Sequence, residues 1–123
     1  MDSKVLPAGL PFSAYTRQGE LLFLSGMLGH KPQRAELVEG GVAAQTRQAL
    51  AHIDTLLCAQ GLSLDNVLKA VIYLTDLQDW ETVNGVWREY FKPPYPARSA
   101  VAVSALMLNA SIEIEVIAST TAV

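Results

Sequence analysis

The chain has 123 residues, of which 50% are apolar and 17% are charged, and it carries a formal net charge of −3 with a pI near 5.2. Such a composition predicts one folded domain over residues 1–123 and argues against disorder. The acidic net charge argues against the basic surface expected of a nucleic-acid-binding protein. No apolar run approaches the roughly 20 residues that cross a bilayer.

The N-terminal segment, residues 1–14, contains Pro7 and Pro11 and little periodic pattern, so we expect an extended arm there. It lacks the apolar core of a signal peptide. Cys58 is the only cysteine, which excludes a disulfide framework and favours a cytoplasmic protein. Because Cys58 falls inside a helical pattern, we expect its thiol to be buried and unreactive.

The first strands are predicted at residues 15–17 and 21–26, separated by a turn at 18–20. The second begins with the continuous apolar run Leu21–Leu24, which is typical of a strand buried on both faces. Residues 29–41 are predicted as a loop. This loop is long for a compact domain, so we expect it to border a functional site.

Two helices are predicted, at residues 42–60 and 80–91. The first has apolar residues on one helical face and is expected to end at Gly61, in the position that glycine often takes after a helix. The second is preceded by possible N-cap residues at 76–79 and ended by prolines.

Three more strands are predicted at residues 67–74, 98–103 and 111–118, with a turn at 106–110. The last strand alternates strictly, with Ile112, Ile114 and Val116 on one face and Glu113, Glu115 and Ile117 on the other.

The order of elements is therefore β-β-α-β-α-β-β in one α+β domain. Two helices can cover one face of the sheet, yet the strands at 21–24 and 71–74 are apolar on both faces. No further helix is predicted that would cover the second face. We therefore expect another copy of the chain to cover it, in a homo-oligomer of closed symmetry.

Metal and cofactor chemistry has little support in the sequence. His30 and His52 have no second ligand at a metal-like spacing, and we interpret both as surface histidines. Neither a phosphate-binding glycine loop nor a G-x-S-x-G nucleophile motif is present. We expect no metal and no cofactor.

The remaining candidates for chemistry are Arg98 and Glu113. Arg98 lies at the start of a strand in Tyr95-Pro96-Ala97-Arg98-Ser99, and its planar guanidinium suits a carboxylate or phosphate. Glu113 lies on the face that we expect to be covered, where a carboxylate must be paired or hydrogen-bonded and could hold a water molecule. The alternative is that Arg98 is an ordinary surface residue and that Glu115 simply points into water.

Over roughly residues 10–118 the chain resembles the RidA/YjgF family of enamine/imine deaminases. The matching segments are Leu24-Ser25-Gly26, residues 37–50, Leu64 to Lys69, Val83-Asn84, Tyr95-Pro96-Ala97-Arg98-Ser99 and Ile112-Glu113-Ile114-Glu115. The last two segments, in this order, make the resemblance specific. It implies a chorismate-mutase-like α+β fold, with two helices on one face of the sheet, and a homotrimer with three clefts between subunits.

The resemblance also implies an activity: hydrolysis of 2-aminoacrylate and 2-iminobutanoate to 2-keto acids and ammonia, without a cofactor. It implies that Arg98 binds the substrate carboxylate, that Glu113 holds the water, and that Gly26 and the Ala100 carbonyl contact the reactants. Phe12 stands where the family often has tyrosine, and Met27 where it often has glutamine. Both changes would make the cleft more apolar and favour imines with larger apolar side chains. The alternative is that Phe12 only packs against a neighbouring subunit and leaves selectivity unchanged.

Other functions remain open at this point. The same cleft would serve a non-catalytic binding module for small carboxylates. A weak ribonuclease activity, also attached to the family, is disfavoured by the acidic composition. A related hydrolysis of aminoacrylate derivatives in pyrimidine breakdown is a further alternative.

Overall fold

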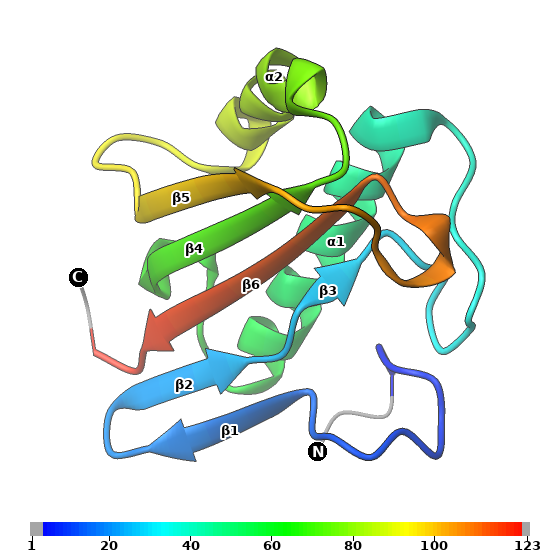
Figure 1. Cartoon of the computed structure of the whole chain (residues 1–123). Helices are drawn as coiled ribbons and strands as arrows, with labels where there is room; N and C mark the ends of the chain where they lie inside the picture. The colour runs from blue at the N-terminus through cyan, green and yellow to red at the C-terminus, as the bar shows by residue number, and fades with distance from the viewer. Residues whose placement is uncertain (1–3, 122–123) are drawn as a thin grey trace.

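The computed structural model describes residues 4–121 and contains one mixed sheet with two α-helices packed on one face (Figure 1). The helices are α1 (Gly41–Ala59) and α2 (Trp80–Tyr90). The strands are β1 (Tyr15–Gln18), β2 (Leu21–Leu24), β3 (Met27–Leu28), β4 (Val67–Leu74), β5 (Ala97–Ala102) and β6 (Ile112–Ser119). Short 3-10 turns lie at Leu64–Asn66, Leu77–Asp79 and Met107–Asn109.

The strand order in the sheet is β1-β2-β6-β4-β5, with β3 paired to β6 beyond the end of β2. Only β5 pairs in parallel, with β4, and it forms one edge of the sheet. The predicted order of elements is confirmed, with β3 as an addition. The predicted strand at 21–26 ends at Leu24, and the chain resumes pairing with β6 at Met27.

The C-terminal end of α1 lies just before Gly61, as predicted. Gly61 adopts a left-handed φ of 74°, and the N–H groups of Gly61 and Leu62 bond to the carbonyls of Cys58 and Leu57 at 3.0 and 2.9 Å. These bonds satisfy carbonyls that the helix end would leave free. Before α2, the Asp76 carboxylate accepts a hydrogen bond from the Gln78 N–H at 2.9 Å.

The hydrophobic core lies between α1, α2 and the facing side of the sheet. Side chains from β2, β4 and β6 meet the apolar stripe of α1, and the largest of those fully buried include Leu22, Leu50, Ile53, Ile72, Ile112 and Ile114. Burying each such side chain stabilises the fold by roughly 1.5–3 kcal/mol. The alternation predicted for β6 is confirmed, since Ile112, Ile114 and Val116 are buried and the residues between them are only partly buried.

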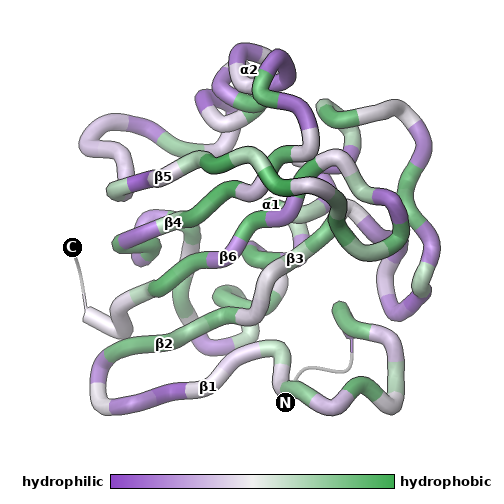
Figure 2. Tube along the Cα trace, in the orientation of Figure 1, coloured by the Kyte–Doolittle hydropathy of each residue, from purple (hydrophilic) through white to green (hydrophobic). Residues whose placement is uncertain are grey.

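The second face of the sheet, turned toward the viewer in Figures 1 and 2, is not covered by either helix. Figure 2 shows apolar stretches along β2, β4 and β6. On this face Phe23 is 40% exposed and Val101 is 44% exposed, and Val71 and Tyr73 are half-buried. A single copy therefore leaves apolar side chains on this face in water, as the sequence predicted.

Residues 1–3 of the predicted N-terminal arm lie outside the described part of the chain. Over residues 4–14 the prediction of an extended arm is wrong. Val5 and Ala14 are each only 1% exposed and join the core. The Gln33 N–H also bonds to the Val5 carbonyl at 2.9 Å, which ties the segment to the loop at 29–41.

The predicted surface positions of the two histidines and the predicted burial of the cysteine are also wrong. His30 and His52 are buried, with stacked rings whose centroids lie 4.2 Å apart, and the His52 Nε2 donates to the His30 carbonyl at 2.7 Å. Burial lowers the pKa of His52, against the opposing effect of that hydrogen bond, and so favours the neutral ring. Cys58 is exposed on α1.

Within residues 4–121, no helix is long and apolar enough to cross a membrane, and no three His, Cys, Asp or Glu side chains are grouped so that they could hold a metal ion.

Candidate active site

Arg98 lies on β5, with its side chain on the face of the sheet that packs against the helices. It is directly paired with Ala70, which is fully buried under the helices, and its Nη2 donates to Asn84 Oδ1 on α2 at 2.5 Å. The Pro-rich approach explains the start of the strand, because the residue before each proline is held in an extended conformation. The predicted position of Arg98 at the start of a strand is therefore confirmed.

The guanidinium of Arg98 has no carboxylate partner within residues 4–121, where the ion pairs are Lys31–Glu36, Arg34–Glu36 and Arg47–Glu89. It is half-buried, and burial lowers its pKa, with a smaller contribution from the positive charge of Arg88. A partly desolvated cation without a counter-ion favours the binding of an anion.

Glu113 lies on β6, on the opposite face of the sheet, and its carboxylate packs onto the backbone of Gly26. A Cβ added at Gly26 would overlap Glu113 Oε2 and lie 2.7 Å from its Cδ, so only glycine leaves room for this carboxylate. In the described part of the chain, the Glu113 side chain accepts no hydrogen bond and forms no ion pair. The sequence analysis named both Gly26 and Glu113 as site residues, and the structure brings these two into direct contact.

The electrostatic environment of Glu113 raises the pKa of its carboxyl group, chiefly through burial and secondly through the negative charge of Glu115. Glu115 is held by a hydrogen bond from the Tyr73 hydroxyl, and Tyr73 is paired across the strands with Glu113. The expectation that Glu115 simply points into water is therefore wrong. Glu113 is the partly buried carboxylate that stays available as a proton acceptor.

A largely apolar pocket of about 220 Å³ opens beside Glu113 and Gly26. Its apolar walls come from the N-terminal segment, β3 and the turn before β6, and include Leu10, Phe12, Leu28, Met107 and Leu108. Leu108 adopts a left-handed φ of 60°, which is costly for a leucine and holds this turn in an unusual shape at the pocket. We call this hollow the Glu113 pocket.

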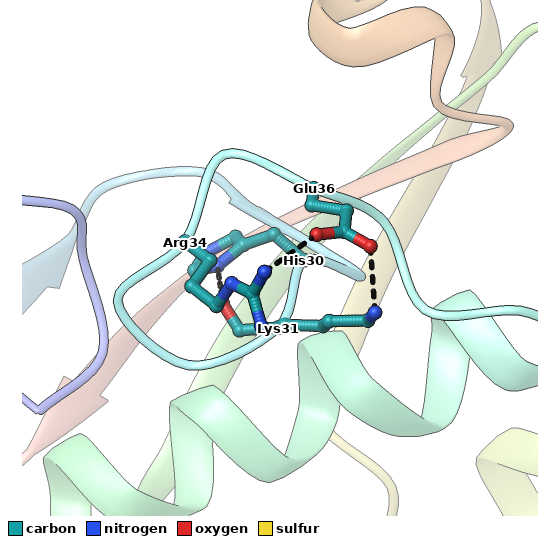
Figure 3. Close-up of polar contacts among 4 residues, drawn as sticks. All are labelled: His30, Lys31, Arg34 and Glu36. Carbon is teal, nitrogen blue, oxygen red and sulfur yellow. Dashed lines mark hydrogen bonds and ion pairs between the residues drawn. The ribbon is translucent and has the colours of Figure 1, made fainter.

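The loop at 29–41 forms one side of the Glu113 pocket, as predicted, through His30, Arg34 and Ala35. Figure 3 shows how the loop is held: Glu36 lies between Lys31 and Arg34, with Nζ and Nη2 at 2.6 and 3.1 Å from its carboxylate oxygens. Both basic groups therefore have a carboxylate partner, which leaves Arg98 as the cation better placed to bind an anionic substrate.

A second hollow of about 270 Å³ contains Arg98 and lies against α2. Its walls are Trp80, Asn84, Trp87, Arg88, Tyr95 and Pro96, and we call it the Arg98 groove. The two hollows share no residue. Because Arg98 is paired with Ala70 and Glu113 with Tyr73, three residues along β4, the two side chains point to opposite faces of the sheet.

The other predicted site residues divide between these hollows. Phe12 and Gly26 line the Glu113 pocket, and Phe12 is 51% exposed. Ala100 lies on β5, two residues after Arg98, on a sheet edge whose backbone groups are half unpaired within one chain. Met27 was expected near the cleft, but it is fully buried in the core, so its thioether contributes nothing to the lining.

A larger pocket, about 430 Å³, lies beside the prolines at 93–96 and contains neither Arg98 nor Glu113. We place the candidate active site at the two smaller hollows, since they contain Arg98 and Glu113, two partly buried charged groups that form no ion pair within residues 4–121.

Three residues near Arg98 were not predicted as site residues: Trp80, Asn84 and Trp87, although Asn84 belongs to one of the segments that carry the family resemblance. Their spacing of four and then three residues places them on one face of a helix, which is visible in the sequence. What the sequence does not show is that this face turns toward β5.

Comparison with known proteins gives a consistent picture. The family model described as "Endoribonuclease L-PSP" matches residues 3–120. The chain is 42% identical over 113 residues to the "2-iminobutanoate/2-iminopropanoate deaminase" of Bos taurus, covering 91% of this chain and 82% of that protein. It is 45% identical over 119 residues to "Reactive Intermediate Deaminase A, chloroplastic" of Arabidopsis thaliana, covering 96% of this chain and 64% of that protein.

Solved structures agree. The crystal structure of RidA from the Antarctic bacterium Psychrobacter sp. superposes with a TM-score of 0.90 at 37% identity, covering 97% of this chain and 96% of that one. The similarity therefore extends over both hollows.

The first prediction concerns the contact between Gly26 and Glu113. Gly26→Ala should displace the Glu113 carboxylate toward water and lower its pKa, because burial is the main cause of its raised value. The pKa is measured by NMR titration of the side-chain carboxyl carbon, and the melting temperature is recorded in parallel. Gly85→Ala is the control: its added Cβ meets nothing within 4 Å, so we expect greater helix stability and an unchanged Glu113. An unaltered Glu113 pKa in Gly26→Ala would contradict the contact.

The second prediction concerns the charge of Glu115. That charge disfavours ionisation of Glu113, so Glu115→Gln should move the titration midpoint of Glu113 to lower pH, though not to the ordinary value, since burial remains. Tyr73→Phe keeps the Glu115 charge and serves as the control, with Glu113 remaining above its ordinary value. If Glu115→Gln leaves the Glu113 midpoint where it was, burial alone accounts for the shift.

Proposed function

The chain belongs to the RidA/YjgF family, and on this premise we propose that it is a deaminase that hydrolyses 2-imino acids and their enamine tautomers to 2-keto acids and ammonia. Its substrates are of the 2-aminoacrylate and 2-iminobutanoate type. The observation that carries the proposal is a pair of partly buried charged groups that form no ion pair within residues 4–121: the Arg98 guanidinium in one hollow and the Glu113 carboxylate, of raised pKa, in the other.

Arg98 binds the carboxylate of the substrate. One of its Nη2 hydrogens is used by Asn84, and the remaining N–H groups are available to form a two-pronged pair with the substrate. This contact orients the imine carbon, and holding two reactants in a productive geometry removes several kcal/mol from a reaction barrier.

Glu113 acts on water. A protonated imine carbon is already electrophilic, so a water molecule adds to it when Glu113 takes one proton from the water as the C–O bond forms. Glu113 then returns that proton to the amino nitrogen, and the C–N bond breaks as the remaining hydroxyl proton passes to Glu113, which gives the 2-keto acid. Glu113 passes this last proton to the departing ammonia, which leaves as ammonium. The raised pKa of Glu113 makes its carboxylate a better proton acceptor than an ordinary glutamate. These steps need only the substrate, water and the two side chains.

The site is shared between two copies of the chain, in a homotrimer. Arg98 and Glu113 face opposite sides of their own sheet, so the Arg98 groove of one copy must meet the Glu113 pocket of a neighbour. The uncovered apolar face of the sheet, with Phe23 and Val101, supports this assembly. The single cysteine is consistent with a cytoplasmic protein, which we propose as its location.

The third prediction tests the shared site. Arg98→Ala and Glu113→Ala should each abolish ammonia release from a freshly generated 2-iminobutanoate, and Arg98→Lys should lose most of it, because an ammonium lacks the planar fork. When the two alanine variants are unfolded, mixed in equal amounts and refolded together, about one quarter of the sites regain both groups. Activity should reappear accordingly, and light scattering should give the mass of a trimer.

The control is each alanine variant refolded alone, which should stay inactive. A mixture that remains inactive although mixed trimers form would contradict the shared site. A wild-type protein that binds 2-oxobutanoate but never releases ammonia would instead be a non-catalytic carboxylate-binding module. RNA cleavage that survives repurification and is lost with Arg98→Ala would favour the ribonuclease alternative.

The fourth prediction concerns side-chain size. The apolar walls of the Glu113 pocket should favour imines derived from leucine or methionine over 2-aminoacrylate, with a graded gain of at most about 0.8 kcal/mol, or fourfold in kcat/KM, per buried methylene. The measurement is a panel of imines of increasing size. Phe12→Tyr places a hydroxyl at the pocket and should flatten the preference. If both proteins rank the panel identically, Phe12 does not set selectivity.

A further inference from the structure

The Arg98 guanidinium lies among three side chains of one helix, and these residues form a structural unit of their own. Trp80, Asn84 and Trp87 occupy one face of α2, and the carbon at the centre of the guanidinium lies 5.1 Å from the Trp87 ring centroid and 6.0 Å from that of Trp80. Trp80 and Trp87 are seven residues apart, an advance of about 10.5 Å along the helix axis, so the single guanidinium lies near two rings that are about two turns apart on one helix face. Asn84 lies between the tryptophans along the helix and accepts the Nη2 hydrogen bond at 2.5 Å.

The rings are held to different degrees. Trp87 is only 4% exposed and stacks on Phe91, with ring centroids 4.5 Å apart and planes inclined by 28°. Trp80 is 43% exposed and sits at the first turn of α2, where it forms the outer wall of the Arg98 groove. The guanidinium thus lies near one buried, stacked aromatic ring and one partly exposed ring.

This arrangement uses the aromatic faces and one N–H of Arg98 and leaves its other N–H groups free for a ligand. An arginine that must also be ordered on binding would lose side-chain entropy at that moment, whereas a held guanidinium has lost it already. The contacts therefore act on affinity through the orientation of Arg98, without any need to touch the ligand.

We propose that Trp80, Asn84 and Trp87 are positioning residues that clamp Arg98 in the orientation that presents its free edge to the carboxylate of a 2-imino or 2-keto acid. This inference rests on the proposed function for its ligand class. The clamp itself is a property of the unliganded protein and is testable without turnover.

The first test is made on the unliganded, full-length protein by NMR of the arginine side chains. In the wild type, Arg98 should give slowly rotating Nη resonances shifted by the ring currents of the tryptophans, assigned by their loss in Arg98→Lys. Trp80→Leu and Asn84→Ala should each collapse these signals to the averaged position of a mobile arginine. Leu77→Ala is the matched control, because Leu77 is a similarly exposed apolar residue, 53% exposed, outside the Arg98 groove. Unchanged Arg98 resonances in both clamp variants would overturn the proposal.

The second test uses 2-oxobutanoate as the probe ligand. Both tryptophans of the chain belong to the clamp, so the intrinsic tryptophan fluorescence reports on this unit alone. The emission of the wild type should change saturably with 2-oxobutanoate and that of Arg98→Ala should not, after correction for the absorbance of the ligand. Calorimetry should show affinity weakened about two- to fivefold by Trp80→Leu, the effect of one partly exposed cation–π contact, and restored in part by Trp80→Phe. Equal affinity in the wild type, Trp80→Leu and Asn84→Ala would also overturn the proposal.

Kinetics separate the clamp from the proposed reaction. A positioning role predicts that Trp80→Leu raises KM for the imine about two- to fivefold while kcat changes less, because Arg98 holds the carboxylate in both the ground state and the transition state. A wild type that binds 2-oxobutanoate through a rigid Arg98 but lacks turnover would refute the deaminase and support the clamp. Turnover by a wild type in which Arg98 is mobile would support the deaminase and refute the clamp.

Discussion

The alternation of side chains along a β-strand is the constraint on which this site depends. Successive residues point to opposite faces, so the register of β5 and β6 on β4 decides where Arg98 and Glu113 point. Arg98 points to the helices and meets α2, and Glu113 points to the other face and meets Gly26. A shift of one residue in the pairing of β5 would turn Arg98 to the other face, and a shift in the pairing of β6 would do the same to Glu113, so either shift would remove one charged group from its hollow.

The same constraint explains why two charged groups remain partly buried without partners. Within one copy, the sheet separates the guanidinium from the carboxylate, so neither can neutralise the other. Each is instead held by neutral groups: Arg98 by an amide and two indole rings, Glu113 by close packing onto a glycine. Such an arrangement sacrifices stability, since a paired charge is easier to bury, and keeps both groups free for a reactant.

Much of the fold was predictable because it follows from local patterns. The stripe of α1, its end at Gly61 and the alternation in β6 depend on neighbours in the sequence, and all three are confirmed. Features set by contacts between distant segments were missed. His30 is buried because its loop folds onto α1 and stacks on His52, and β3 is only two residues long.

The candidate site shows the same division. Arg98 and Glu113 were identified from their residue types and from the resemblance to a family, but their opposite orientation depends on which residues of β4 they pair with. Likewise, the spacing of Trp80, Asn84 and Trp87 is visible in the sequence, whereas their contact with Arg98 requires β5 to lie parallel to β4 and beside α2. The orientation of Arg98 and Glu113 and the contact of α2 with Arg98 are thus set by strand pairing between distant segments, which composition and periodicity do not show.

The orientation of the two hollows also bears on the symmetry of the assembly. In a two-fold dimer one partner meets a single surface of each copy, and the Arg98 groove and the Glu113 pocket open on opposite faces of the sheet. If every Arg98 is to meet a Glu113, each copy needs two different neighbours, one for each face. Contacts of this kind join unlike surfaces and close only as a ring, of which three copies form the smallest. The face of the sheet that leaves Phe23 and Val101 exposed would then be covered by the same contacts that complete the site, so that assembly and activity depend on one set of surfaces.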